Sequence, residues 1–510
     1  MKKAVVIGAG IGGLAAAARL AKQGYEVDLF EKNAEPGGRA GRIEQDGFRF
    51  DTGPTLFLMP EVFAATYADL GERMEDHLDL VRIDPTYRVH FYDESTLDLS
   101  SNLNRMQAQL DAIETGSFQA FLSFLAEGGR HYQLSLERFV GRNFTTLLDY
   151  FSPSNLPLLF KLKALQKHAA NTGRYFHDPR LLAAFSFQNM YLGLSPYDAP
   201  ATYSLLQYTE LADGIWFPKG GMYQVIASLE KIAAGLGVRL HYSSPVQAIE
   251  VEGSRTNGIR LENGERLPAD VVLANADLPY VYSRLLPDDG SAARLSRKKF
   301  TSSALMFYWG VEGMRPPELL HHNVFLADHR YRESFSQIFD KHSLPAEPSF
   351  YVSAPTRTDP SFAPEGSDSL MVLVPVGHLD STNPQDWEAL QQRARQSVLQ
   401  RLDELGVKNL EQHIVFERSW GPPYYEKELN LAKGAAFGLS HNFSQVGYLR
   451  PHNRHPRYRN LYFAGASTHP GTGLPIVLLS AKLAVERLLQ EQPLGRTKTY
   501  SLPQGQMERI

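Results

Sequence analysis

Residues 3–31 read KAVVIGAGIGGLAAAARLAKQGYEVDLFE, and this stretch decides the fold. Its first five residues are typical of a buried parallel strand, and a glycine loop then leads into an Ala- and Leu-rich helix predicted over residues 12–22. Gly24 is a plausible C-cap, and a second strand is predicted over residues 27–30. Strand, loop, helix and strand in this order predict a Rossmann-like α/β fold with a parallel sheet.

The glycine loop matches the G-x-G-x-x-G fingerprint of dinucleotide-binding folds. Gly8 permits a tight turn, Gly10 lets the backbone approach a pyrophosphate, and Gly13 lets the helix pack closely on the strand. The phosphates would lie at the helix N-terminus, where free N–H groups favour negative charge. An acidic residue about 20 positions further on would accept a hydrogen bond from a ribose hydroxyl and disfavour a 2′-phosphate. The nucleotide-binding residues predicted here are Gly8, Gly10, Gly12, Gly13, Glu31 and the adjacent Lys32.

A second glycine cluster follows, with EPGGR at residues 35–39 and GFRFDTGP at residues 47–54. Adjacent glycines before an arginine suit a loop that passes close to a diphosphate, because the guanidinium supplies charge-assisted hydrogen bonds. A plain NAD site has no need of such a loop. The alternative for Arg39 and Arg42 is that both are solvated loop charges. We predict that Gly38, Arg39, Gly53 and Pro54 contact the cofactor.

The composition excludes several classes of function. A net charge of -4 argues against bulk binding of nucleic acid. The chain has no cysteine, which excludes disulfides, cysteine-ligated metals and a cysteinyl flavin, and we expect no metal site. The basic start at residues 1–3 and the apolar run behind it imitate an export signal, but the phosphate-loop pattern favours a folded strand, loop and helix. No segment reaches the roughly 18–20 apolar residues of a transmembrane helix.

Two later segments resemble those of one family. Residues 214–221 are GIWFPKGG, and residues 460–475 are NLYFAGASTHPGTGLP. Both are similar to segments of the bacterial and fungal carotenoid (phytoene) desaturases, which belong to the FAD-dependent amine oxidase-like flavoproteins of the glutathione-reductase type. The similarity covers residues 3–489. It implies FAD bound non-covalently and a hydride transfer from a long polyene to the flavin, with a quinone or oxygen as electron acceptor.

The resemblance makes phytoene the first candidate substrate and diapophytoene the second. A related polyene-modifying oxidase or isomerase of the same fold is the third candidate. A flavin amine oxidase and a non-catalytic isoprenoid-binding protein similar to the Rab GDP-dissociation inhibitors stay open as alternatives. The resemblance also implies a C-terminal flavin loop whose helix N-terminus faces the pyrimidine end of the flavin. The further cofactor-binding residues are Gly465, Thr472, Gly473, Leu474 and Pro475, together with Val246 on the adenine side.

The α/β pattern recurs in three stretches of the chain. We predict a discontinuous FAD-binding domain over residues 1–90, 215–300 and 415–490. Residues 91–214 and 301–414 would form an interleaved α+β domain that binds substrate and associates with a membrane, and residues 491–510 a flexible tail. Long helices rich in Leu, Phe and Tyr, broken by prolines, are predicted between about 90 and 210. Asn257-Gly258 and Asn263-Gly264 are predicted hairpin turns.

The candidate for catalysis by a side chain is Asp149. It stands between apolar residues, and it resembles the place of an aspartate proposed for acid–base or charge-stabilising work in the desaturase family. Burial would raise its pKa, whereas the alternative is a solvated helix residue. His469, in the predicted flavin loop, is interpreted as a structural or flavin-contacting residue, with catalysis as the alternative.

A water-insoluble polyene implies contact with a membrane, so we predict a cytoplasmic, peripherally membrane-associated protein of unknown oligomeric state. Leu158, Leu162 and Leu165 would share one face of an interfacial helix, with Lys163 and Lys167 opposite. Residues 294–299 contain a second basic cluster, Arg294, Arg297, Lys298 and Lys299. For both stretches the alternative is an ordinary solvated face.

Overall fold

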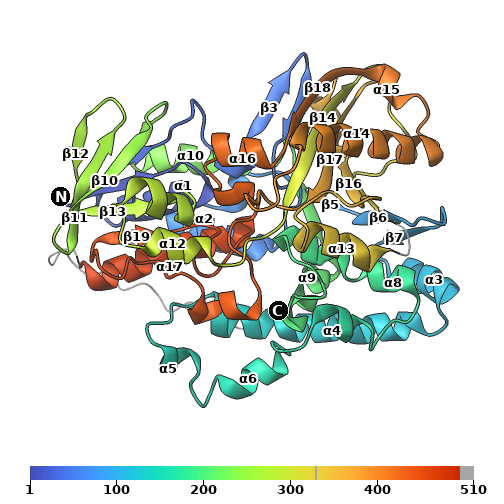
Figure 1. Cartoon of the computed structure of the whole chain (residues 1–510), viewed down its shortest axis with the longest axis horizontal. Coiled ribbons are helices and arrows are strands. Elements are labelled where there is room, and N and C mark those ends of the chain that lie inside the picture. Colours follow the sequence, from blue (N-terminus) through green and yellow to red (C-terminus); the bar gives the residue numbers. More distant parts are fainter. Residues whose placement is uncertain (328–329, 494–510) are drawn as a thin grey trace.

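The computed structural model describes residues 1–327 and 330–493 (Figure 1). Its first sheet has five parallel strands. In order across the sheet these are β19 (Leu461–Phe463), β13 (Val271–Ala274), β1 (Lys3–Ile7), β2 (Glu26–Phe30) and β9 (Arg239–His241). Three distant stretches of the chain therefore build one sheet. Successive residues of β1 are buried in two separate cores, one on each face, which explains why the strand is apolar throughout.

Three helices pack together on one face of this sheet. They are α1 (Ile11–Lys22), α10 (Tyr223–Gly235) and α17 (Leu474–Glu491). The four consecutive alanines at residues 15–18 are all fully buried, because their small side chains let the neighbouring helices approach closely. The predicted fold class is confirmed.

An antiparallel sheet of three strands packs on the opposite face. It contains β10 (Val246–Glu252), β11 (Arg255–Leu261) and β12 (Arg266–Pro268). Asn263-Gly264 lies at the predicted turn between β11 and β12. The prediction for Asn257-Gly258 was wrong, because both residues lie inside β11, where the pairing register shifts and an added Cβ on Gly258 would approach Leu267 O. The turn lies instead at residues 253–254, with Gly253 at φ +58°.

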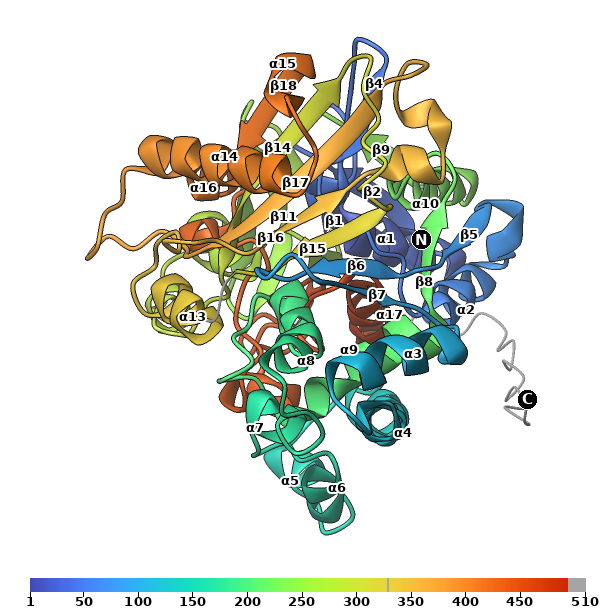
Figure 2. The same ribbon diagram turned by 90° about the vertical axis from the view of Figure 1, so that its right-hand side faces the viewer.

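A seven-stranded mixed sheet forms the other half of the molecule (Figure 2). Its order is β18 (Ile414–Trp420), β14 (Ser303–Val311), β17 (Asp368–Val376), β16 (Phe350–Ser353), β15 (His322–Phe325), β6 (Tyr87–His90) and β7 (Thr96–Leu99). Helix α14 (Trp387–Glu404) covers one face. Strand β6 lies before the predicted boundary at residue 90, and nearly all of β18 lies after the predicted boundary at residue 415. Both strands nevertheless belong to this sheet. The division into two domains stays a prediction. The sheet places its first boundary better before β6 and its last boundary better after β18.

The helices between residues 102 and 213 are mostly short. They are α3 (Leu103–Ile113), α4 (Ser117–Ser135), α5 (Leu147–Tyr150), α6 (Leu156–Lys161), α7 (His168–Thr172), α8 (Pro179–Ala184) and α9 (Leu205–Tyr208). The prediction of long helices holds for α3 and α4 only. Pro157 and Pro179 do not break helices but lie in the first turns of α6 and α8, where a missing N–H costs nothing. Helices α5 and α6 project from the body of the molecule (Figures 1 and 2).

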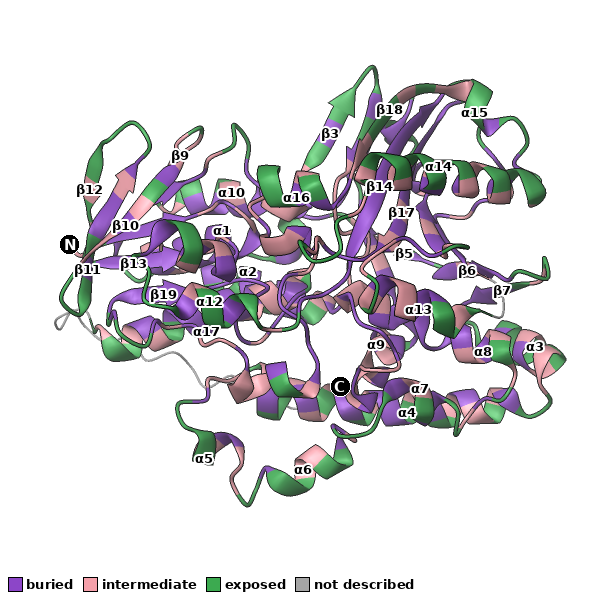
Figure 3. Ribbon diagram, in the orientation of Figure 1, coloured by how far each residue is buried: buried purple, intermediate pink, exposed green. Residues whose placement is uncertain are grey.

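The remaining elements connect these layers. They are β3 (Arg42–Gln45), β4 (Phe48–Asp51), α2 (Pro60–Leu70), β5 (Leu80–Ile83), β8 (Ile215–Pro218), α11 (Leu278–Tyr280), α12 (Ser291–Ser296), α13 (Tyr331–Phe339), α15 (Leu410–His413) and α16 (Pro422–Glu428). Figure 3 shows that the strands of both large sheets are mostly buried and that exposed residues gather on helices and hairpin tips. Among the described residues, no helix is both long and apolar enough to cross a membrane. Residues 494–510, most of the predicted tail, lie outside the described residues.

Candidate flavin site

The glycine loop joins β1 to α1 at the carboxyl end of the central strand of the parallel sheet. Gly8 has φ +96° and donates its N–H to Phe30 O at 2.8 Å. A Cβ on Gly13 would lie 1.9 Å from Gly8 O, so only glycine fits where the helix meets the strand. A Cβ on Gly10 would lie 2.9 Å from Oδ1 of Asn275, a residue that we did not predict. The structure thus shows the tight turn expected at Gly8 and the close approach of helix and strand expected at Gly13.

Glu31 is buried at the end of β2. Its carboxylate accepts the N–H of Ala9 at 2.8 Å and that of Asn33 at 3.0 Å, so it braces the glycine loop. Ser244 donates its N–H to the carbonyl of Glu31, which brings Val246 to the same end of the sheet. Lys32 instead donates to the carbonyl oxygen of Glu428 at 2.5 Å and holds α16.

The second glycine cluster lies against the first. Gly37 donates its N–H to Ala9 O at 2.9 Å, and a Cβ on Gly38 would lie 3.7 Å from Gly10 Cα. Arg39 donates to Ala436 O at 3.1 Å, and its guanidinium is 3.7 Å from Asp277 Oδ1. Burial lowers the pKa of Arg39. These two contacts anchor the guanidinium of Arg39 beside both loops, although its side chain keeps 32% of its accessible surface.

Gly53 and Pro54 follow β4 and lie beside the arginine. A Cβ on Gly53 would lie 1.9 Å from Arg39 O, so the two loops touch backbone to backbone. Arg42 differs in its partners, because it stacks on Tyr223 at 4.5 Å and pairs with Glu35 and Glu44 at the surface. The surface ion pairs of Arg42 agree with the alternative of a solvated charge, whereas contact of Arg39 with the cofactor stays a prediction.

The C-terminal loop meets the N-terminal loop at two helix ends. A Cβ on Gly12 would lie 2.8 Å from Cγ1 of Val477, so the first turn of α1 touches the first turn of α17. Neither helix has a side-chain cap or an acidic residue in its first turn. Two uncapped helix N-termini side by side create a site for negative charge. The diphosphate and the pyrimidine end of FAD fit this arrangement.

Buried polar residues that we did not predict hold the C-terminal loop. Gly465, at φ +140°, donates its N–H to Ser480 Oγ at 3.2 Å, and Thr472 donates its N–H to His441 Nε2 at 3.0 Å. Asn275 donates to Ala464 O at 2.9 Å. Arg450 donates to five carbonyl oxygens, those of Leu439, Ser440, Gln445, Ala466 and Thr468. Residues 439–445 and 465–473 thus form one rigid wall.

Several polar side chains in the interior between the two halves keep part of their accessible surface. They are Arg39, Asp51, Tyr191, Tyr203 and Tyr351. Asp51 accepts the N–H groups of Met222 and Tyr223, both at 2.9 Å. Burial raises the pKa of Asp51 to about 6.

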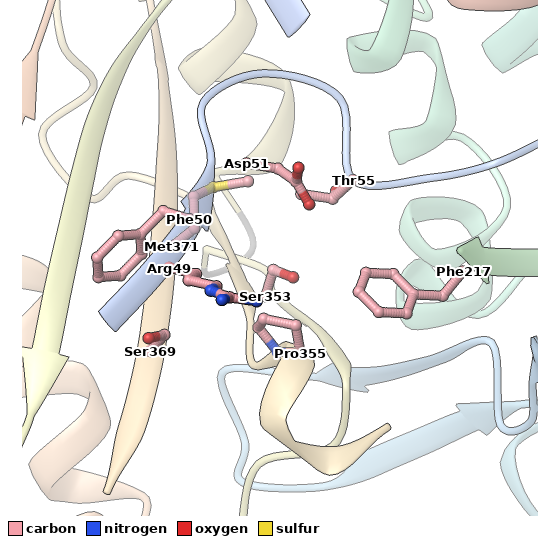
Figure 4. Close-up of a pocket in the computed structure, with 9 residues that line it drawn as sticks. All are labelled: Arg49, Phe50, Asp51, Thr55, Phe217, Ser353, Pro355, Ser369 and Met371. Atoms are coloured by element: carbon pink, nitrogen blue, oxygen red, sulfur yellow. The ribbon is translucent and has the colours of Figure 1, made fainter. Parts of the chain in front are cut away.

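Asp51 and Thr55, just after Pro54, line a small pocket against the seven-stranded sheet (Figure 4). The lining side chains are Arg49, Phe50, Asp51, Thr55, Phe217, Ser353, Pro355, Ser369 and Met371. The inner wall beside the second glycine cluster is thus partly polar and built from both halves of the molecule.

Asp149 lies on α5, with its side chain 32% exposed and paired with Arg142 at 2.8 Å. It is therefore not the buried carboxyl group that the sequence allowed. The ion pair nevertheless connects to the predicted flavin loop through Arg142, because His469 Nε2 donates a hydrogen bond to Arg142 O at 2.9 Å. Burial lowers the pKa of His469 to about 4, so the ring is neutral near pH 7. A role for Asp149 stays a prediction.

Residues 11–489 match the family described as flavin containing amine oxidoreductase. The chain belongs to this family. It is 51% identical over 493 residues to the zeta-carotene-forming phytoene desaturase of Myxococcus xanthus, covering 96% of this chain and 94% of the relative. It is 34% identical to the 4,4'-diapophytoene desaturase (4,4'-diaponeurosporene-forming) of Staphylococcus aureus, covering 97% of this chain and all of the relative. The predicted membership of the carotenoid desaturases is confirmed, and the chain is a flavin-dependent oxidoreductase.

The fold agrees with that of solved structures that share little sequence identity with this chain. The structure of a putrescine oxidase redesigned in its cofactor binding has a TM-score of 0.63 and 14% identity, with coverage of 96% of this chain and 98% of the other. At this identity the likeness shows the fold alone. The alternatives of an amine oxidase and of a non-catalytic isoprenoid-binding protein are not favoured, because the most similar relatives reported above are desaturases.

Proposed function

We propose that this protein is an FAD-dependent desaturase of phytoene, which turns C–C into C=C bonds of a long polyene. The observation that carries the proposal is the 51% identity, along almost the whole chain, to a zeta-carotene-forming phytoene desaturase. Diapophytoene is the second candidate substrate, supported by the lower identity of 34%.

FAD would be held non-covalently where the two uncapped helix ends meet. When bound, its flavin accepts a hydride from a substrate carbon. The backbone N–H groups at the starts of α1 and α17 and the guanidinium of Arg39 would offset the charge of the diphosphate and of the flavin's pyrimidine end. Glu31 would take the ribose, and Val246 the adenine side. The protein would hold the polyene against the flavin and away from water.

The test of this function is expression in a host that accumulates phytoene, followed by pigment analysis, and then the same with a host that accumulates diapophytoene. Conversion of phytoene supports the proposal. Unchanged phytoene together with conversion of diapophytoene would replace the substrate and keep the flavin chemistry. A purified protein without a yellow chromophore would contradict the cofactor as well.

Asp149→Ala is expected to lower turnover without releasing FAD. The carboxylate orients Arg142, whose carbonyl holds His469 in the flavin loop, so its loss would disturb charge and position near the flavin while the phosphate site stays intact. Turnover and flavin content per chain are the measurements. Glu137→Ala, an exposed acid of the same region, is the control. Wild-type turnover in Asp149→Ala would remove Asp149 from the mechanism.

A projecting lobe, residues 147–165, would attach the protein to the membrane. Nine large apolar side chains are exposed in the described chain, and five of them belong to this lobe. They are Leu147, Leu148, Leu156, Phe160 and Leu165, with Leu148 82% and Phe160 75% exposed. Peripheral attachment there would let a polyene enter from the lipid and let electrons leave to a quinone, with oxygen as the alternative acceptor.

The predicted interfacial helix was wrong in detail. Helix α6 ends at Lys161, and Leu162 is buried. Lys163 has φ +50° and turns inward, where it pairs with Glu127. It thereby supplies the cation that the buried carboxylate of Glu127 needs. Lys167 and Lys299 both pair with Asp198, so one member of the second basic cluster serves a surface ion pair.

Leu148→Asp combined with Phe160→Asp is expected to weaken vesicle binding at least tenfold. Burying each side chain is worth about 1.5–3 kcal/mol, so losing both exceeds the ~1.4 kcal/mol of a tenfold change. Flotation with phosphatidylcholine and phosphatidylglycerol vesicles is the measurement. Val415→Asp, at a side chain 56% exposed on β18, is the matched control. Equal flotation of the double variant and the wild type would locate the membrane surface elsewhere.

A further inference from the structure

A buried carboxylate lies between the second glycine cluster and the C-terminal loop. Asp277 stands at the N-cap position of α11, yet its side chain makes no capping hydrogen bond there. The side chain is fully buried, and its Oδ1 instead accepts a hydrogen bond from the Ser467 hydroxyl at 2.6 Å. Its Oδ2 accepts the N–H of Ala432 at 3.4 Å. Because burying a charge is costly, a carboxylate in this place points to a function.

The cation that faces this carboxylate belongs to the second glycine cluster. The guanidinium of Arg39 lies 3.7 Å from Asp277 Oδ1 and donates to Ala436 O at 3.1 Å. The side chain of Arg39 keeps 32% of its accessible surface, whereas that of Asp277 keeps none. The guanidinium therefore has room for a further anion, while the carboxylate is enclosed by protein.

A short loop closes these contacts into a ring. The carbonyl of Ala436 accepts from Arg39, and Leu439, three residues further on, donates its N–H to Ser467 Oγ at 3.4 Å. Ser467 donates in turn to Asp277, which faces Arg39. The ring therefore fixes the carboxylate and the guanidinium relative to the C-terminal loop that is predicted to bind the flavin.

A second buried guanidinium interacts with the same carboxylate. Burial lowers the pKa of Arg450 to about 10, and the neighbouring Tyr203 and Asp277 oppose that shift. Arg450 donates to Leu439 O and to Thr468 O, both at 3.0 Å, so it contacts the same two segments that the ring joins. Two guanidinium groups thus share one carboxylate beside the predicted flavin loop. Charges in a buried cluster act on one another more strongly than in water.

We propose that Asp277 sets the reduction potential of the bound flavin by offsetting the charge of Arg39 and Arg450. This inference rests on the proposed function, in which FAD lies between these loops. Reduction places negative charge at the pyrimidine end of a flavin, and nearby protein charges tune that change. A guanidinium favours it, and a carboxylate opposes it. Asp277 therefore keeps the potential lower than the two arginines alone would make it, which favours the passage of electrons to the acceptor.

The test is a reductive titration of the FAD-loaded protein under argon, in which flavin absorbance is read against a reference dye. Asp277→Asn removes the charge but keeps an oxygen that can accept from Ser467. It is expected to shift the equilibrium at least tenfold toward reduced flavin, which for two electrons is about 30 mV more positive. Arg39→Gln is expected to shift it at least tenfold the other way. A merely structural role would not give shifts of opposite sign.

Two further variants separate charge from structure. Asp270→Asn is the matched control, because it removes the same charge next to the other end of β13, where Asp270 is exposed and accepts the N–H of Lys3 at 2.7 Å. Its potential should equal that of the wild type. Ser467→Ala removes the hydrogen bond to Asp277 and keeps the charge, so it should shift the potential less than Asp277→Asn does.

The outcomes distinguish this inference from the function on which it rests. An unchanged potential in Asp277→Asn, or shifts of the same sign in Asp277→Asn and Arg39→Gln, would overturn the role of Asp277 and leave the flavin site in place. A shift in Ser467→Ala as large as that in Asp277→Asn would assign the effect to the loop and overturn the role as well. Arg39→Gln still tests the sign should Asp277→Asn fail to fold. A wild-type protein that takes up no flavin would contradict the proposed function itself.

Discussion

Replacing Gly13 by valine is expected to give a colourless protein that does not retain flavin. The first atom of any side chain at this position would lie 1.9 Å from Gly8 O, far inside van der Waals contact. Since the clash is with backbone, relief requires the loop and the start of α1 to move apart. That movement would also break the contact between Gly12 and Val477, which sets the two helix ends beside each other.

Flavin absorbance per chain after gel filtration measures this effect, and titration of the apoprotein with FAD gives its size. We expect affinity to fall by at least a factor of ten, or about 1.4 kcal/mol. Gly235→Ala is the control, because a Cβ there meets nothing within 4 Å and the glycine lies in a helix. Wild-type flavin content in Gly13→Val would show that the N-terminal loop does not form the diphosphate site.

The parts of the fold that the sequence predicts well are the local ones. Strand β1, helix α1 and strand β2 follow from apolar runs and glycines within 30 residues of each other. The joining of residues 460–475 to the glycine loop rested on family resemblance, and the contact between α1 and α17 now gives it a geometric basis. The Rossmann-like half was therefore predictable because each of its elements carries its own signal.

The residues that sequence reasoning missed are polar groups whose partners are distant backbone atoms. Asn275 directly follows the buried strand β13, and a polar residue at the carboxyl end of a parallel strand was a signal that could have been used. Arg450 offers no such signal, because its role depends on contacts that no periodicity encodes. The lobe around α6 was predicted as one longer helix because Lys163 could not be known to turn inward.

Arg450→Met is expected to cause the largest loss of stability among the variants considered. Arg450 is 1% exposed and donates from all three guanidinium nitrogens, at 3.0 Å to Thr468 O and 2.9 Å to Ser440 O among others. Burial lowers the pKa of Arg450 only to about 10, so the charge is retained near pH 7 and strengthens these bonds. Methionine fills similar volume without a donor, and it leaves four carbonyl oxygens unsatisfied, whereas Ser440 O keeps the hydrogen bond from Gln445 Nε2.

Each unsatisfied buried group costs about 1–3 kcal/mol, and even with partial relaxation the free energy of unfolding should fall by at least ~3 kcal/mol. Urea denaturation followed by flavin fluorescence and by circular dichroism measures the loss, and the flavin signal should change first because Arg450 joins the two segments of the C-terminal wall. Arg450→Lys keeps the charge but not the planar fork and should give an intermediate value. Arg459→Met, at an exposed arginine of the same segment, is the control and should unfold like the wild type. If Arg450→Met unfolds at the same urea concentration as Arg459→Met, the five hydrogen bonds do not hold the flavin wall together.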